Sequence, residues 1–129
     1  MVDADHGYGN ALNVRRTVEE LEMAGIAGMS IEDTDLPNPF GAGGKASLIS
    51  LEEGVGKMRA ALDARIDPDL VIAGRTSAPG IAGVEEAVRR VKAYEEAGVD
   101  ALFLVGVKNR DDLASIAAEV STPIILGSA

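Results

Sequence analysis

Short apolar runs alternate along the chain with longer stretches in which apolar residues recur at helical spacing. The runs are "MV" at the start and residues 26–31, 70–74, 101–105 and 123–127. Apolar runs of this length without polar alternation are typical of strands that are buried on both faces of a parallel sheet. We therefore predict strands at these segments, each followed by a helix.

The stretches between the runs predict amphipathic helices, because their apolar residues fall on one face at a period near 3.6. These residues are Val14, Val18 and Leu21; Val55, Met58 and Leu62; Val84, Val88 and Val91; and Leu113, Ile116 and Val120. Ser50 and Glu53 have the spacing of a capping box at a helix start. Gly25 and Gly98 stand where left-handed helix ends are expected.

An internal repeat supports this alternation of strands and helices. "EMAGIAGMSI" from Glu22 matches "EEAGVDALFL" from Glu95 in its Glu, Ala, Gly and apolar positions, at an offset of 73 residues. Two βα units of about 36 residues would produce that offset. The pattern predicts one α/β domain over residues 1–129, with a sheet that is either doubly wound or closed as a barrel. The long Gly- and Pro-containing segment 33–50 is expected to be a loop.

Composition narrows the class of protein. The chain has 129 residues, no cysteine and a net charge of −9. The charge argues against nucleic acid and anionic membranes as partners, because binding either needs clustered Lys and Arg. The absence of a long apolar segment and of a basic, hydrophobic leader predicts a cytoplasmic protein. The length falls far short of the roughly 250 residues of a complete (β/α)8 barrel.

Polar side chains gather at the carboxyl ends of the predicted strands. They are Asp3, Asp5, Glu32, Asp33, Arg75 and Ser128. In parallel α/β folds these strand ends open on one rim, where ligands bind. We therefore expect these residues from four strands to meet at one site.

Three of these carboxylates, Asp3, Asp5 and Glu32, favour a metal site, since their mutual repulsion must be offset by a cation or a proton. A ligand set of oxygen atoms without His or Cys favours Mg²⁺, with Mn²⁺ as the alternative. The competing interpretation is a frayed terminus and a turn carboxylate. Arg75 either clamps a substrate carboxylate with its two-pronged donor geometry or forms a salt bridge to Glu32 or Asp33.

His6 and Tyr8 lie in the glycine-containing turn that follows the first strand. His6 is the only histidine, but its place in a turn favours a capping or packing role over general base catalysis. Tyr8 either points into the mouth of the site or covers the start of the next helix.

The stretch "VDADHGYGNALNVRRTVEELEMAGIAGMSIED" closely resembles the isocitrate lyase and phosphoenolpyruvate mutase superfamily. "LISLEEGVGKMRAALDAR", "VIAGRT" and "AYEEAGVDALFLVG" extend the resemblance over nearly the whole chain, and the branch most similar to it is that of the oxaloacetate decarboxylases, often labelled carboxyvinyl-carboxyphosphonate phosphorylmutase-like. The resemblance implies a (β/α)8 TIM barrel, of which this chain would span strands three to seven as a partial barrel.

The resemblance also implies roles for individual residues. Asp3 would be the direct metal ligand, while Asp5 and Glu32 would hold metal-bound waters. Arg75 would bind the substrate carboxylate and orient the substrate for catalysis. The loop 33–50 would be the gating loop over the site.

Departures from the family pattern narrow the implied activity. The lyases that cleave isocitrate and methylisocitrate carry a catalytic Cys in this loop, and the chain has none; the mutases carry a Lys and an Asn there, whereas Lys45 is out of register. The expectation is therefore Mg²⁺-dependent decarboxylation of a small 2-oxo acid, oxaloacetate, to pyruvate through a metal-stabilised enolate. The alternatives are an enzyme acting on a P–C bond, and a truncated fragment of little activity that self-associates as a homo-oligomer.

Overall fold

The computed structural model describes residues 1–127 and alternates strands with helices along the chain. The strands are β1 (Val2–Asp3), β2 (Gly28–Glu32), β3 (Val71–Thr76), β4 (Ala101–Val105) and β5 (Ile124–Gly127). The helices are α1 (Ala11–Met23), α2 (Leu51–Ala64), α3 (Ala78–Ile81), α4 (Val84–Ala97) and α5 (Arg110–Ala117). Every strand that the apolar runs predicted is present, with ends that differ from the prediction by at most two residues.

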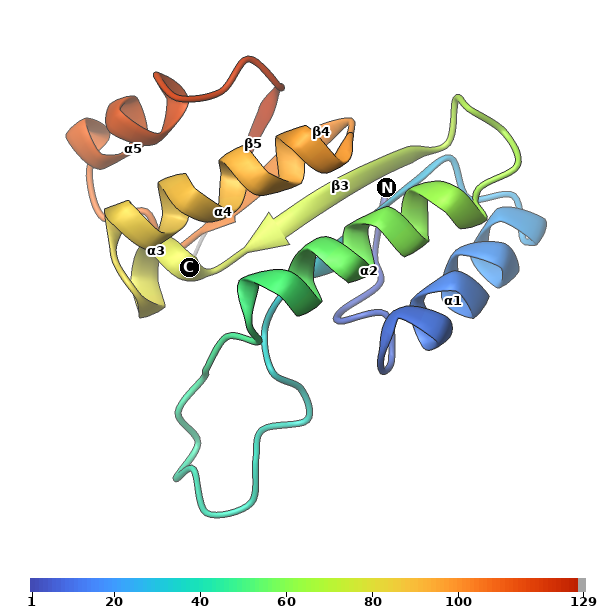
Figure 1. The fold of residues 1–129 in the computed structure, drawn as a ribbon, viewed down its shortest axis with the longest axis horizontal. Coiled ribbons are helices and arrows are strands. Elements are labelled where there is room, and N and C mark those ends of the chain that lie inside the picture. The colour runs from blue at the N-terminus through green and yellow to red at the C-terminus, as the bar shows by residue number, and fades with distance from the viewer. Residues whose placement is uncertain (128–129) are drawn as a thin grey trace.

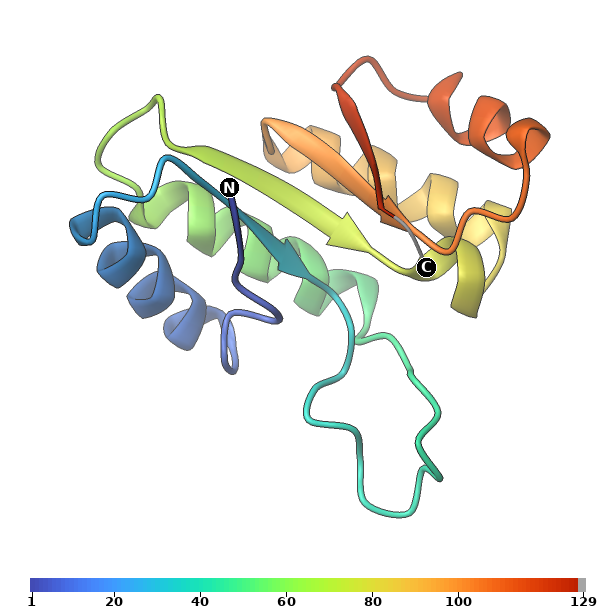
Figure 2. The ribbon, with the colours of Figure 1, turned by 180° about the vertical axis from the view of Figure 1, so that it is seen from behind.

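The five strands form one parallel sheet in the order β1-β2-β3-β4-β5. Helices α2 and α4 lie in front of this sheet in Figure 1 and behind it in Figure 2, so both cover the same face. Helix α1 packs beside α2, and α5 packs beside α4. A doubly wound sheet has helices on both faces, whereas a barrel has them only outside. The arrangement is therefore that of part of a barrel wall.

The hydrophobic core lies between the sheet and its helices. Alternate strand residues point toward the helices and are fully buried, and they are Met29, Ile31, Ile72, Leu102 and Leu104. The helices contribute a facing set, which consists of Val14, Val18, Met58, Val91, Tyr94 and Ile116. Burial of each large apolar side chain contributes about 1.5–3 kcal/mol to stability. This core fixes the positions of the strand ends that carry the polar residues.

The helix ends follow the sequence signals in most cases. The Ser50 hydroxyl accepts a hydrogen bond from the Glu53 backbone N–H, which is one half of the expected capping box. The complete box is formed instead at α1 by Asn10 and Asn13, two residues that were not predicted to form it. Gly98 ends α4 in the left-handed region with a φ of 107°.

Helix α5 is shorter than its apolar stripe suggested, since it ends at Ala117, before Val120. The chain then continues through Thr122 to a proline, and the residue before a proline disfavours the helical conformation. Thr122 donates its backbone N–H to the carboxylate of Glu95 at 2.7 Å, which holds this segment outside the helix.

The internal repeat has a structural counterpart at the amino ends of the strands. The carboxylate of Glu22, in the last turn of α1, accepts a hydrogen bond from the backbone N–H of Ile66 at 2.9 Å, in the loop before β3. Glu95 stands 73 residues later, in the last turn of α4, and accepts from Thr122 in the loop before β5. Each glutamate thus fixes the loop that leads into a later strand. Within residues 1–127 no helix is both long and apolar enough to cross a membrane.

Candidate metal and substrate site

The parallel register brings the predicted site residues to one face of the sheet. Asp3 pairs with Ser30, and Glu32, two residues further along β2, pairs with Arg75 of β3. Because side chains alternate between the two faces of a strand, Asp3, Glu32 and Arg75 point to the same side. This side is the face of the sheet opposite α2 and α4. In a barrel, that face lines the interior. The sequence suggested that Arg75 follows the strand, whereas in the structure Arg75 lies within β3.

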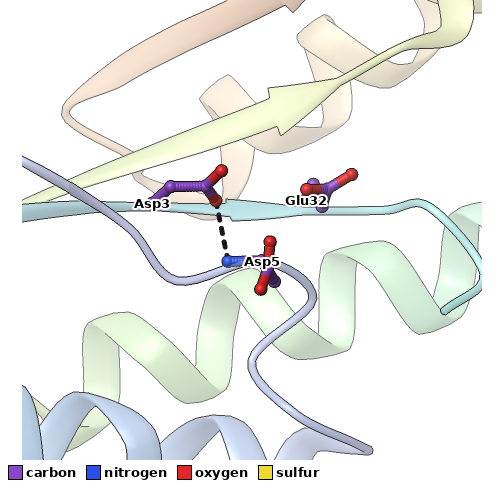
Figure 3. A group of neighbouring side chains, drawn as sticks. All are labelled: Asp3, Asp5 and Glu32. Carbon is purple, nitrogen blue, oxygen red and sulfur yellow. Dashed lines mark hydrogen bonds between the residues drawn. The ribbon is translucent and has the colours of Figure 1, made fainter. Parts of the chain in front are cut away.

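The carboxylates of Asp3, Asp5 and Glu32 converge at this rim (Figure 3). One oxygen atom of each residue lies within 4.8 Å of those of the other two. Asp3 and Glu32 come from adjacent strands, and Asp5 comes from the turn after β1. The alternative interpretation, a frayed terminus with a turn carboxylate, does not describe this arrangement, because Asp3 and Glu32 both belong to the sheet.

The turn that presents Asp5 is held by two hydrogen bonds and an unusual backbone conformation. The Asp5 backbone N–H donates to Asp3 Oδ1 at 2.8 Å, and its carbonyl accepts from the Glu32 N–H at 2.8 Å. The φ of Asp5 is 48°, in the left-handed region, which aspartate enters more readily than most residues. The local structure therefore holds Asp5 beside two other acids.

Arg75 is the cation nearest to this cluster. Its Nη1 atom lies 3.1 Å from Asp3 Oδ2, and its Nε atom lies 4.0 Å from Glu32 Oε1. The guanidinium also stacks over the ring of Phe103, 5.3 Å from the ring centroid. Its buried Nε has no hydrogen-bond partner among residues 1–127. One guanidinium faces three carboxylates, so the protein groups of the cluster leave it negatively charged.

Asp33 does not belong to this site, although the sequence analysis had placed it there. Its carboxylate is fully buried and accepts hydrogen bonds from Arg90 and Tyr94 of α4, on the helix side of the sheet. Of the two acids named as possible salt-bridge partners of Arg75, Glu32 therefore lies within reach and Asp33 does not, and Asp3 is an additional partner. Ser128, also predicted at the rim, lies outside the described residues.

Thr34 is a neighbour of the cluster that the sequence analysis missed. Its hydroxyl donates to Glu32 Oε2 at 2.5 Å, and both residues are buried. This bond uses one oxygen atom of Glu32 and fixes the orientation of the carboxylate. The other oxygen, Oε1, faces Arg75. The spacing of two residues was visible in the sequence, but a threonine at the start of a loop carries no distinctive signal.

Lys57 of α2 supports the turn that carries Asp5 and His6. Its ammonium group donates to the carbonyl of His6 at 2.9 Å, and only 6% of the residue is exposed. Burial lowers the pKa of Lys57, although the charges of Glu53 and other nearby acids oppose this change. A cavity of about 230 Å³ adjoins the ammonium group and the side of the turn. Hydrogen bonds from α2 and from β2 therefore both hold the turn.

His6 and Tyr8 lie beside one another in the same turn. Their rings pack edge to face, with centroids 5.6 Å apart. Tyr8 is exposed and has a φ of 63°. Desolvation, with contributions from Asp5 and Asp3, raises the pKa of Tyr8.

Comparison with known proteins identifies the family. The family described as phosphoenolpyruvate phosphomutase matches residues 1–128. The chain belongs to this family. It is 62% identical over 129 residues to an oxaloacetate decarboxylase of Bradyrhizobium diazoefficiens and 63% identical over 128 residues to one of Rhodopseudomonas palustris. These alignments cover 100% and 99% of this chain but 44% of each relative, so the chain spans less than half the length of these curated relatives.

Solved structures give the same result. Phosphonopyruvate hydrolase in complex with oxalate and Mg²⁺ matches with a TM-score of 0.82 and 36% identity, over 97% of this chain and 44% of that one. Oxaloacetate acetylhydrolase bound to 3,3-difluorooxalacetate matches with a TM-score of 0.86 and 32% identity, over 97% and 43%. 2,3-Dimethylmalate lyase, of the phosphoenolpyruvate mutase/isocitrate lyase superfamily, matches with a TM-score of 0.85 and 33% identity, over 95% and 42%. The resemblance and the partial-barrel prediction are both confirmed.

Proposed function

We propose that this chain carries the metal-binding and carboxylate-binding residues of a Mg²⁺-dependent lyase that decarboxylates oxaloacetate to pyruvate. The observation that carries the proposal is the convergence of Asp3, Asp5 and Glu32 beside Arg75 on the inner face of the sheet. Relatives named oxaloacetate decarboxylase at 62% and 63% identity support the choice of substrate.

The residues of the cluster fit a divalent cation. All three side chains offer carboxylate oxygens, the ligands that Mg²⁺ and Mn²⁺ prefer. The cluster retains negative charge after Arg75 is counted, and hydrogen bonds with Asp3 and Glu32 hold the Asp5 backbone in place. Asp3 would bind the metal directly, with Asp5 and Glu32 holding its water ligands. When bound, Mg²⁺ would supply Lewis-acid stabilisation of the negative charge that develops on the 2-oxo group as CO₂ leaves.

Arg75 would bind and orient the substrate. Its guanidinium presents several N–H donors in a plane that matches a carboxylate, and it lies at the rim beside the carboxylate cluster. The Phe103 ring lies against this guanidinium, with its centroid 5.3 Å from Arg75 Cζ. A fixed carboxylate contact holds the scissile bond in one orientation relative to the carbonyl, which is catalysis by positioning.

Thr34 would hold the Glu32 carboxylate in the orientation that metal binding requires. The hydroxyl of Thr34 occupies Glu32 Oε2, which leaves Oε1 directed toward the cluster. Such neighbours of metal-binding groups typically contribute 10–100-fold to metal affinity or activity. The loop 33–50 begins directly after Glu32, and we propose that it covers the bound substrate.

A second candidate substrate is phosphonopyruvate, because the hydrolase of that name matches the fold at 36% identity. Both compounds are small 2-oxo acids and would use the same cation and the same arginine. The higher identity to the decarboxylases favours oxaloacetate.

The test is the formation of pyruvate from oxaloacetate in the presence of Mg²⁺, compared with Mg²⁺ alone, which slowly catalyses the same reaction. Asp3→Ala removes the direct ligand, and Asp63→Asn, on an exposed part of α2, is the matched control. We expect a rate above the free-metal rate for wild type and Asp63→Asn only. A wild-type rate equal to that of Mg²⁺ alone would contradict the proposal for this chain. Release of phosphate from phosphonopyruvate would instead favour the second candidate.

A further inference from the structure

The long loop between β2 and α2 is closed at its base by pairing between its two ends. The Ile49 N–H donates to the Asp33 carbonyl at 2.9 Å, and the Asp35 N–H donates to the Ser47 carbonyl at 2.8 Å. Thr34 and Leu48 form an antiparallel bridge between these bonds. We call residues 33–35 and 47–49 the neck of the loop. Beyond the neck the loop projects away from the sheet and the helices (Figures 1 and 2).

Arg90 of α4 contacts both sides of this neck. Its Nη1 donates to Asp33 Oδ2 at 3.0 Å, and its Nη2 donates to the Ile49 carbonyl at 2.7 Å. The third donor, Nε, is 3.2 Å from Glu86 Oε1 on the same helix. The residue is only 5% exposed, and Asp33 is fully buried. A single guanidinium therefore joins the two strands of the neck to the helix layer.

The charges around this contact keep it intact. Burial disfavours the charge of Arg90, but the hydrogen bond and the charge of Asp33 outweigh burial and raise the pKa of Arg90. Burial, together with the Asp33 carboxylate, also raises the pKa of Tyr94, whose hydroxyl donates to Asp33 Oδ2 at 2.6 Å. Both donors thus remain protonated at neutral pH.

The geometry points to Arg90 as a positioning residue: we propose that it clamps the two sides of the neck, so that the loop moves only beyond residues 35 and 47. The clamp also holds the chain directly after Glu32, because Asp33 is the next residue. That the loop covers a substrate rests on the proposed function, whereas the clamp itself rests only on these contacts. A lysine at this position could keep the charge pair with Asp33 but lacks the fork that reaches Ile49 at the same time.

The test is amide hydrogen exchange of the neck. The exchange rates of the Asp35 and Ile49 N–H groups are measured and divided by the rates of N–H groups in the sheet. Arg90→Lys is the main variant, and Arg89→Met is the matched control, since Arg89 also pairs with Glu86 but is exposed. Loss of one charge-assisted hydrogen bond corresponds to at least about tenfold in the local opening equilibrium. We therefore expect normalised neck exchange to rise at least about tenfold in Arg90→Lys and to stay unchanged in Arg89→Met.

Two further variants separate clamping from a general contribution to stability. Tyr94→Phe removes a hydrogen bond to Asp33 but leaves the contact between Arg90 and Ile49, so neck exchange should rise less than in Arg90→Lys. Arg90→Met removes both contacts and should lower the melting temperature more than Arg90→Lys, which keeps the charge pair. The expected result is that lysine restores stability without restoring protection of the neck.

The proposal would be overturned if Arg90→Lys left normalised neck exchange unchanged, or if Tyr94→Phe raised it by as much as Arg90→Lys. Parallel recovery of stability and neck protection by lysine would also overturn it, since that outcome describes a purely structural ion pair. If Arg90→Met does not fold, the comparison of neck exchange in Arg90→Lys and Tyr94→Phe still tests the proposal. These readouts need no substrate, so failure of the clamp and failure of the decarboxylase proposal are distinguishable.

Discussion

Glu32 and Asp33 are neighbours in the sequence but have opposite surroundings. Glu32 faces two further carboxylates, Asp3 and Asp5, and only one guanidinium lies among the three. Asp33 is fully buried and is neutralised by Arg90, with a tyrosine hydroxyl as a second donor. The alternation of side chains across the end of β2 separates them, because one residue faces the interior of the barrel and the next faces the helices.

The difference shows how a protein distributes its acids between stability and function. A buried carboxylate whose charge is balanced by protein groups stabilises the fold, and removing either partner is costly. A cluster whose charge is left unbalanced costs stability until a cation arrives. Substitutions at and near Glu32 and Asp33 should therefore change stability in opposite directions.

The largest effect is expected for Asp33→Asn. This change keeps the shape of the side chain but leaves the buried guanidinium of Arg90 without its main counter-charge. Breaking a buried ion pair in this way lowers the free energy of unfolding by about 3–5 kcal/mol. Chemical denaturation measures the loss, with Asp63→Asn, on an exposed side chain, as the control. A loss below about 1 kcal/mol, the value of an exposed pair, would contradict the role assigned to Asp33.

The opposite sign is expected for Asp5→Asn in metal-free buffer. Removal of one charge relieves repulsion from Asp3 and Glu32, whose oxygen atoms lie within 4.8 Å of an oxygen of Asp5. At such separations each like-charge contact costs on the order of 1 kcal/mol in a water-like dielectric. The free energy of unfolding should therefore rise slightly or stay constant. A clear decrease would mean that Asp5 stabilises the fold in the absence of a cation.

The smallest effect concerns Glu95, a carboxylate that is satisfied by neutral donors. Hydrogen bonds from Thr122 and Ser121 lower the pKa of Glu95 below its usual value of 4.5. A lowered folded-state pKa stabilises the protein above the unfolded-state value, and the contribution is lost as the pH falls through the folded-state value. Glu95→Gln should therefore lower the melting temperature at pH 7 and have progressively less effect below pH 4.5. A difference that does not depend on pH would exclude the carboxylate charge as its cause.

Strand identity and period-two alternation suffice to bring Asp3, Glu32 and Arg75 to one face, as the sequence predicted, whereas the prediction of Asp33 at the rim was wrong. The roles of Arg90 and Lys57 were missed, since each bonds a partner more than 40 residues away. The sequence nevertheless contained a signal for the buried positions of Arg90 and Lys57. Both residues stand on the buried faces of their helices, among Ala87, Val91 and Tyr94 in α4 and among Gly54, Met58 and Ala61 in α2. A charge on an apolar helix face indicates a buried polar partner.

Other features could not have been derived from sequence patterns alone. The left-handed turn at Asp5 depends on hydrogen bonds to two strands, and aspartate is compatible with many turn conformations. The face of the sheet to which Asp33 points depends on whether β2 continues in register past Glu32. The composition of the loop does not determine this. Tertiary contacts, rather than local preference, decide both cases.

The central claim is that the three carboxylates at the rim form a site for a divalent cation. Calorimetric titration with Mn²⁺, followed by competition with Mg²⁺, tests it most directly, using wild type, Asp5→Asn and Asp63→Asn. We expect one Mn²⁺ site in wild type and in Asp63→Asn, from which Mg²⁺ displaces the Mn²⁺, and an affinity reduced at least about tenfold in Asp5→Asn. Equal Mn²⁺ binding by wild type and Asp5→Asn, or no binding by wild type, would contradict the claim.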